Sequence, residues 1–168
     1  KRLAGSSLPR EFYVEPAVYR EDVQRVFLNL WLVAGHIASI PRPGDYFLYD
    51  IGYESLIVVR SNDDTVSVLV NVCPHRGSRV CIEEYGHCRQ FACPLCGWVF
   101  DLNGTLREAA NMPAQFDRAK HSLARAKVAV VEGVILFCLG DSADISTLAS
   151  DVTDDDCRVP PDWVDAML

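Results

Sequence analysis

Two short segments of the chain combine cysteine, histidine, proline and glycine in a pattern that suits metal binding. Residues 73–77 read CPHRG and residues 93–98 read CPLCGW, with seventeen residues between the histidine of the first segment and the first cysteine of the second. Thiolate and imidazole ligands together favour iron–sulfur, zinc or copper sites over magnesium or calcium sites. The prolines stiffen each loop, and the glycines let the backbone pass close to a bound group. The predicted ligands are Cys73, His75, Cys93 and Cys96.

The segments that must position these loops read as short β-strands separated by turn residues. Asn103-Gly104 is a strong hairpin signal, and Gly133 between two β-branched runs indicates a second tight hairpin. Many short strands at regular spacing predict a mainly β fold, a small antiparallel sandwich or barrel with the metal site at its tip. The predicted strands cover residues 32–36, 45–51, 54–60, 66–71, 90–92, 99–102, 126–132 and 134–139.

One helix is expected before the strands. Pro16 suits the first turn of a helix, and apolar residues follow it with approximate helical spacing, which predicts a helix over residues 16–29. After Gly140 the chain becomes acidic, and residues 142–148 read as a short helix. The predicted divisions are an N-terminal extension with the helix (1–35), a metal-binding β domain (36–140) and an acidic C-terminal segment (141–168).

Composition excludes several classes of partner. The formal charge of the 168 residues is −7, without a basic run, so we expect no nucleic-acid binding, which needs clustered Lys and Arg. The apolar runs are too short or too interrupted to span a bilayer, and no leader segment opens the chain. We therefore expect a cytoplasmic protein without membrane contact. Seven cysteines in such a compartment do not favour a disulfide framework.

The two cysteine segments and their surroundings resemble the Rieske [2Fe–2S] family, whose pattern is Cys-x-His, a spacer commonly of this length, and Cys-x-x-His. The match is closest to the N-terminal Rieske domain of the alpha subunits of Rieske non-haem iron (aromatic-ring-hydroxylating) oxygenases. Residues 71–77 fit the first ligand loop of that family, and residues 97–104 fit the segment after the second loop. Residues 15–19 are similar to its N-terminal helix. The resemblance extends from about Glu11 to Leu139.

The resemblance implies that Cys73 and Cys93 bind the inner iron of the cluster and that His75 binds the outer iron. Cys96 stands where the family has its second histidine, because Gly97-Trp98 fixes the alignment. A thiolate adds a negative charge that a neutral imidazole lacks. The reduction potential should therefore fall between the ranges of Rieske centres and plant-type ferredoxins. His87 is the alternative fourth ligand, although it lies in the spacer and would require a refolded loop.

Zinc is the rival metal, because three cysteines and one histidine also complete a tetrahedral structural zinc site. In that case the protein would be a structural or interaction module without redox activity.

The family resemblance implies one-electron transfer. A ferredoxin or flavin reductase would donate the electron, and the mononuclear iron of an oxygenase catalytic domain would accept it, between neighbouring subunits of a homotrimer in a full alpha subunit. The last histidine of the sequence is His121, so these residues lack the paired histidines of such an iron site. The chain is then either a fragment of an alpha subunit or a stand-alone electron carrier, and is not catalytically complete by itself. The segment 141–168 is either the start of the catalytic domain or a tail.

The remaining cysteines and histidines are expected to have structural roles. Cys81 and Cys88 could pair, but reduced, partly buried thiols are favoured. Trp98 is expected to pack beneath the second loop. Cys138 is expected in the core, and Cys157 is expected to be exposed. His36 and His121 are expected to be hydrogen-bonded or surface histidines and not ligands.

Overall fold

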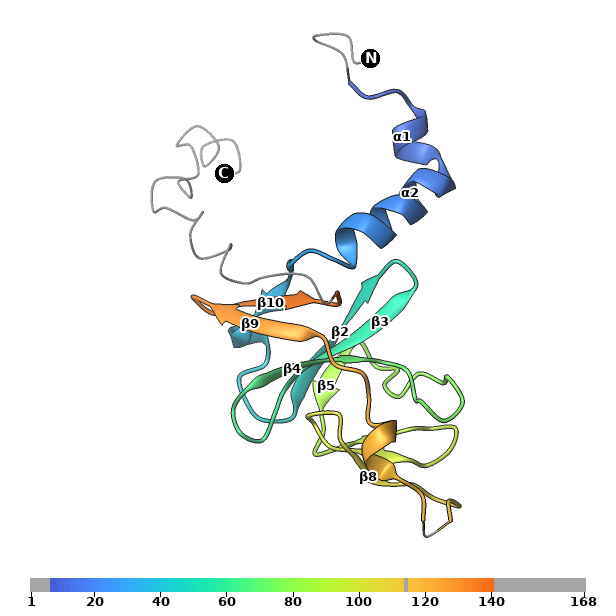
Figure 1. Ribbon diagram of the computed structural model, residues 1–168. Coiled ribbons are helices and arrows are strands. Elements are labelled where there is room, and N and C mark those ends of the chain that lie inside the picture. The colour runs from blue at the N-terminus through green and yellow to red at the C-terminus, as the bar shows by residue number, and fades with distance from the viewer. Residues whose placement is uncertain (1–6, 114, 141–168) are drawn as a thin grey trace.

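Three antiparallel sheets make up the protein in a computed structural model that describes residues 7–113 and 115–140 (Figure 1). The first sheet has the strand order β1 (Leu32–His36), β10 (Val134–Cys138) and β9 (Lys127–Val131). The second has the order β4 (Val66–Val70), β3 (Glu54–Arg60), β2 (Asp45–Ile51) and β5 (Tyr85–His87). The third has the order β6 (Phe91–Ala92), β7 (Val99–Phe100) and β8 (Leu106–Glu108). The mainly β, antiparallel fold is as predicted, and within the described residues the sheets do not close into a barrel.

Strand β3 lies between two hydrophobic cores, which explains its uninterrupted run of apolar residues. Successive side chains of a strand point to opposite faces of the sheet. Leu56 and Val58 pack with the first sheet, including Phe137 of β10. Ile57 and Val59 pack in the other core, which includes Trp98 and the inner residues of the third sheet. The second core therefore joins the central sheet directly to the region of the two cysteine loops.

Both predicted hairpins are present. Glu132 and Gly133, with φ of +49° and +82°, connect β9 to β10, and Val131 pairs with Val134. Two central residues with positive φ suit the twist of a tight antiparallel hairpin. At the other hairpin, between β7 and β8, Gly104 has φ of +84°, and a Cβ atom there would lie 2.9 Å from the Leu69 side chain. A glycine is thus required by both backbone conformation and space.

The sequence pattern missed strand β5 and gave no bounds for β8. Each has three residues, too few for a clear alternation of polar and apolar side chains. Strand β5 pairs with the start of β2, and a Cβ atom at Gly86 would lie 2.9 Å from the hydroxyl oxygen of Tyr46. Close packing of the backbone against an aromatic ring, and not side-chain alternation, defines this strand.

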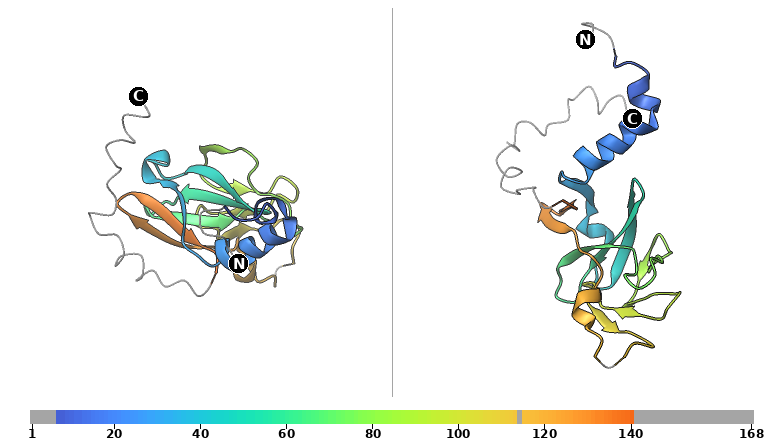
Figure 2. Two further views of the ribbon diagram at one scale, coloured as in Figure 1. Left: turned by 90° about the horizontal axis from the view of Figure 1, so that it is seen from above. Right: turned by 45° about the vertical axis from the view of Figure 1, so that its right-hand side comes forward.

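The N-terminal helix is longer and less regular than predicted. It consists of α1 (Glu11–Val14), α2 (Pro16–Asp22) and a π-helical turn (Val23–Phe27). Glu15 between α1 and α2 has an extended backbone, because the residue before a proline is disfavoured in the helical conformation. The helix projects away from the sheets in two views (Figures 1 and 2), and Val23 is its one buried residue.

Two short 3-10 turns, Ile37–Ser39 and Arg118–His121, complete the described elements. No helix among the described residues is long and apolar enough to cross a membrane. The short helix predicted over residues 142–148 lies outside the described residues.

Candidate metal site

The two cysteine loops have the same backbone arrangement. In the first, the Gly77 N–H donates to the Cys73 carbonyl over 2.9 Å, and in the second the Gly97 N–H donates to the Cys93 carbonyl over 2.9 Å. The two glycines have φ of +72° and +71°. The Cys73 and Cys93 N–H groups each donate, over 2.8 Å, to the residue that follows the glycine of their own loop. Both loops are therefore tight turns that present their first cysteine in the same way.

The two loops bring three thiols together. The Sγ atoms of Cys73, Cys93 and Cys96 all lie within 4.8 Å of one another. The Cys73 and Cys96 sulfurs lie 3.7 Å apart. Cys73 and Cys93 are buried, with 1% and 2% of their surface exposed, whereas Cys96 is half-buried. Residues 20 and 23 positions apart along the chain thus form one cluster of soft donor atoms.

His75 lies beside this cluster without joining its tightest group. Its Nδ1 atom is buried and has no hydrogen-bond partner among the described residues. A buried polar atom without a partner is costly, and a bound metal ion is one way to satisfy it. The donor set of three thiols and an imidazole therefore fits an iron–sulfur cluster in its chemistry.

The imidazole of His75 stacks on the indole of Trp98. The two rings are stacked, with centroids 4.6 Å apart and an angle of 5° between their planes. The rings of Phe116 and His121 each form a T-shaped contact with the indole, at centroid distances of 5.4 and 6.0 Å. Trp98 is 1% exposed and packs in the core, as the sequence indicated, and this packing restricts the orientation of the His75 imidazole.

The protein environment acts differently on the two buried thiols. Burial raises the pKa of Cys73 to about 12. Burial also acts to raise the pKa of Cys93, but donors from the Cys96 backbone, the Cys96 thiol and the Leu95 backbone outweigh it, so that pKa is lowered. Amide donors stabilise a thiolate, which is the form that binds a metal.

Asn71 holds the first loop in place, a role that the sequence motif did not reveal. Its side chain is fully buried at the end of β4. The Oδ1 atom accepts from the N–H groups of Val80 and Cys81 over 3.0 and 2.8 Å, and Nδ2 donates to the Cys81 carbonyl over 2.7 Å. One amide side chain thereby satisfies three backbone groups across the base of the loop.

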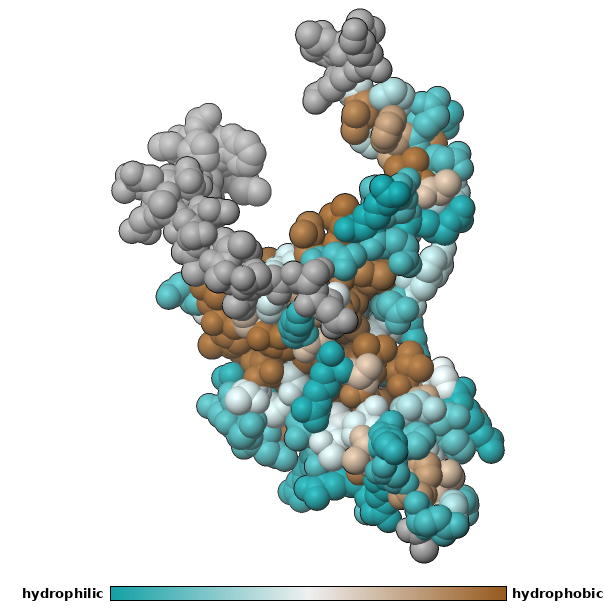
Figure 3. Space-filling view, in the orientation of Figure 1, coloured by the Kyte–Doolittle hydropathy of each residue, from teal (hydrophilic) through white to brown (hydrophobic). Residues whose placement is uncertain are grey.

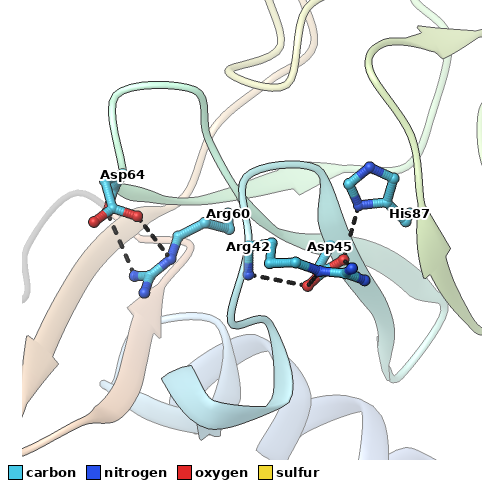
Figure 4. A network of polar contacts seen from close by, with 5 residues as sticks. All are labelled: Arg42, Asp45, Arg60, Asp64 and His87. Carbon is cyan, nitrogen blue, oxygen red and sulfur yellow. Dashed lines mark hydrogen bonds and ion pairs between the residues drawn. The ribbon is translucent and has the colours of Figure 1, made fainter.

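His87, the alternative ligand considered from the sequence, has another partner. Its Nδ1 atom lies 2.8 Å from Oδ1 of Asp45, which also interacts with Arg42 (Figure 4). The His87 hydrogen bond is the largest cause that lowers the pKa of Asp45, followed by burial, which opposes it, and by contacts with Arg42. His87 therefore joins β5 to the start of β2. Figure 4 also shows the Arg60–Asp64 ion pair at the turn after β3.

The remaining described cysteines are free thiols. Burial, followed by the nearby Cys81, raises the pKa of Cys88 to about 11. Cys138 is 1% exposed in the core, as expected, while Cys157 lies outside the described residues.

Comparison with known families decides what this site belongs to. The family profile described as the Rieske [2Fe–2S] domain matches residues 30–131, which include both cysteine loops. This chain belongs to the Rieske [2Fe–2S] domain family. The family implies a [2Fe–2S] cofactor.

Curated relatives are oxygenase subunits. The chain is 34% identical over 137 residues to the glycine betaine monooxygenase oxygenase subunit of Pseudomonas aeruginosa, covering 81% of this chain and 32% of that protein. It is 36% identical over 151 residues to the benzene 1,2-dioxygenase alpha subunit of Pseudomonas putida, covering 86% and 33%. It is thus homologous to the N-terminal part of Rieske oxygenase alpha subunits and spans about a third of their length.

Solved structures of oxygenases are also similar to this chain. Naphthalene 1,2-dioxygenase from Rhodococcus sp. superimposes with a TM-score of 0.79 at 29% identity, over 86% of this chain and 34% of that one. A quaternary ammonium Rieske monooxygenase, CntA, gives a TM-score of 0.78 at 25% identity, over 86% and 42%. Most of this chain is therefore matched, while most of each relative lies outside the match.

Proposed function

We propose that this Rieske domain carries single electrons through a [2Fe–2S] cluster with an unusual ligand set. Cys73 and Cys93 would hold the inner iron, and His75 and Cys96 the outer iron. The observation that carries the proposal is the convergence, inside a Rieske domain, of three sulfurs within 4.8 Å of one another beside a buried, unpartnered His75 Nδ1. When bound, such a cluster supplies a one-electron redox couple.

Cys96 should set the redox properties of the site. A thiolate ligand adds negative charge and favours the oxidised state. Rieske centres span roughly −150 to +300 mV, and plant-type ferredoxins lie near about −400 mV. We expect a potential between these classes. With one imidazole at the outer iron, only His75 would couple electron transfer to a ligand proton near neutral pH.

The partners follow from the relatives and are part of the proposal. Oxygenase subunits homologous over this region suggest a ferredoxin or flavin reductase as the electron donor. The acceptor would be a mononuclear non-haem iron centre of an oxygenase catalytic domain, reached across a subunit contact in a homotrimer. We propose the same division as from the sequence: an N-terminal extension (1–35), the domain that holds the cluster (36–140) and an acidic C-terminal segment (141–168). The cytoplasmic location stays a prediction.

Zinc is the second candidate, and the three-thiol group favours it specifically. Sulfurs within 4.8 Å of one another could all bind a single ion, with His75 as the fourth ligand. Under this reading the domain would be a structural module without electron transfer.

Metal analysis and spectroscopy of one protein preparation distinguish the iron–sulfur cluster from the zinc site. Iron, zinc and acid-labile sulfide are quantified in the anaerobically purified chain, and absorption and low-temperature EPR spectra are recorded after dithionite reduction. Two irons, two sulfides and a rhombic reduced signal are expected. A colourless protein with one zinc would refute the electron-transfer proposal.

A further inference from the structure

The thiol of Cys96 lies near two other thiols, those of Cys73 and Cys93. A cysteine at position 96 can form a disulfide bond with such a neighbour, whereas a histidine cannot. The Cys96 and Cys73 sulfurs lie 3.7 Å apart although they come from different loops. A disulfide bond is about 2.05 Å long, so the two atoms need to approach by about 1.7 Å. Each loop is anchored by its own backbone hydrogen bonds.

The three thiols differ in their access to solvent. Cys73 and Cys93 are 1% and 2% exposed, whereas Cys96 is half-buried. Cys96 also lines a hollow of about 250 Å³, together with His75, Leu95 and Met112 among other residues. Cys96 is therefore the most accessible of the three thiols to a small molecule that enters this hollow. The Cys73 sulfur lies 3.7 Å from that of Cys96.

We infer that Cys96 and Cys73 form a reversible disulfide when no metal is bound, and that this bond controls cluster assembly. The inference rests on the proposed function, because it concerns the regulation of the same site. The Cys96 thiolate attacks a low-molecular-weight disulfide, such as oxidised glutathione, forms a mixed disulfide and releases one glutathione thiolate. The Cys73 sulfur then attacks the Cys96 sulfur and releases the second glutathione, which takes up the proton that the Cys73 thiol loses. Two protein thiols are oxidised, and one small disulfide is reduced to two thiols.

The bond would block the site completely. It would consume one proposed ligand of the inner iron and one of the outer iron, so neither iron would keep its full ligand pair. A thiol reductant reverses the bond and restores both ligands. The family's Cys-x-x-His pattern lacks this property, since imidazole forms no such bond. The Cys73–Cys96 bond therefore requires the cysteine at position 96.

Cys93 is a less favourable partner for Cys96. The Cys96 sulfur lies 3.7 Å from the Cys73 sulfur, whereas the Cys93 sulfur is placed only within 4.8 Å of the other two. A Cys93–Cys96 bond would close a loop of two intervening residues, whereas the Cys73–Cys96 bond links the two loops. The two outcomes are separable by peptide mapping.

The test uses the 168-residue chain, from which iron is removed anaerobically with a chelator and a reductant. The reductant is then removed, oxidised glutathione is added, and free thiols are alkylated before trypsin digestion. Cleavage at arginine places Cys73 in peptide 61–76, Cys81 and Cys88 in 80–89, and Cys93 and Cys96 in 90–107. We expect peptides 61–76 and 90–107 to be linked, with a mass decrease of about 2 Da relative to the two thiols.

Two variants assign the linked atoms. Cys93→Ser should keep the link, and Cys96→Ser should abolish it. A link that survives in Cys96→Ser, a bond within peptide 90–107, or two fully alkylated peptides would each overturn the inference. Circular dichroism of the metal-free proteins confirms that each variant remains folded.

Cluster reconstitution gives the second readout. Oxidised metal-free protein should gain no visible absorption from ferrous iron and sulfide until a thiol reductant is added, and Cys96→His should be insensitive to the glutathione treatment. Assembly in the presence of the intact bond would overturn the regulatory role. Iron and sulfide analysis of the untreated protein tests the proposed function separately, because the peptide link is measured after the metal has been removed, whichever metal that was.

Discussion

At the scale of single residues, the site combines what the family expects with one substitution of chemical consequence. Cys73 and Cys93 occupy equivalent positions in two equivalent turns. His75 is oriented by its stack on Trp98, and its Nδ1 atom has no other partner among the described residues. Cys96 alone departs from the family pattern, so it is the residue on which redox properties should depend most.

Replacing Cys96 with histidine should move the protein towards an ordinary Rieske centre. Removal of one thiolate charge stabilises the reduced state, so the midpoint potential should rise into the range of roughly −150 to +300 mV. A second imidazole also adds a second redox-linked ionisation. Potentiometric titration monitored by visible absorption across a range of pH measures both effects. Cys88→Ser, a half-buried thiol outside the three-thiol group, is the control, and an unchanged spectrum in Cys96→His would contradict ligation by Cys96.

At the scale of elements, strand ends and turns position the loops more than the strands themselves do. The first loop begins where β4 ends, and Asn71 joins that point to Val80 and Cys81. The second loop connects β6 and β7, strands of only two residues each. Such short strands owe their place to the core beneath them, where Phe91 and Phe100 are buried.

Asn71→Ala should destabilise the domain through the first loop. It leaves two buried N–H groups and one buried carbonyl without their side-chain partner, at a cost of about 2–4 kcal/mol in the free energy of unfolding. Denaturant unfolding of the protein measures this change. Asn62→Ala, at an exposed turn, is the matched control and should change stability by less than about 0.5 kcal/mol. Equal stability of the two variants would show that Asn71 does not anchor the loop.

At the scale of the whole molecule, a central sheet between two cores supports a metal site at one end and a projecting helix at the other (Figure 1). Figure 3 shows apolar side chains gathered around the first sheet and the base of the helix. Val33, Val130 and Val131 are exposed there. The matched relatives extend well beyond the length of this chain, which covers about a third of each.

Acid stability should depend on the Asp45–His87 pair, which ties β5 to the central sheet. The pKa of Asp45 is lowered in the folded protein, below its ordinary value of 3.8. Its stabilising effect is therefore complete above that value and is lost as the pH falls through the lower, folded pKa. His87→Gln removes the largest cause of the lowering. The difference in melting temperature between wild type and variant should be present at pH 6 and disappear well below 3.8.

Carboxyl NMR provides the check on this mechanism. The pKa of Asp45 should rise in His87→Gln, while that of Asp63, which is lowered by Thr65, should not change. A melting difference that persists at the lowest pH would assign the role of His87 to packing instead.

The sequence by itself determined the chemistry and the class of fold. The spacing of Cys73, His75, Cys93 and Cys96 predicted the donor set, because ligand types and short Pro- and Gly-containing loops are properties of local sequence. The runs that form β2 and β3 were predicted with their observed bounds, since seven-residue strands bounded by turns give a clear pattern. Both hairpins were predicted because turn residues with positive φ leave a local signature.

Only the tertiary structure decided how these groups meet. It placed Cys96 beside Cys73, engaged His87 with Asp45, and gave Asn71 its three backbone partners. It also defined β5, whose three residues have no pattern of their own. The Cys73–Cys96 and Asp45–His87 contacts join segments far apart along the chain, and the Asn71 contacts span a loop, so all depend on packing that local propensity and spacing do not specify.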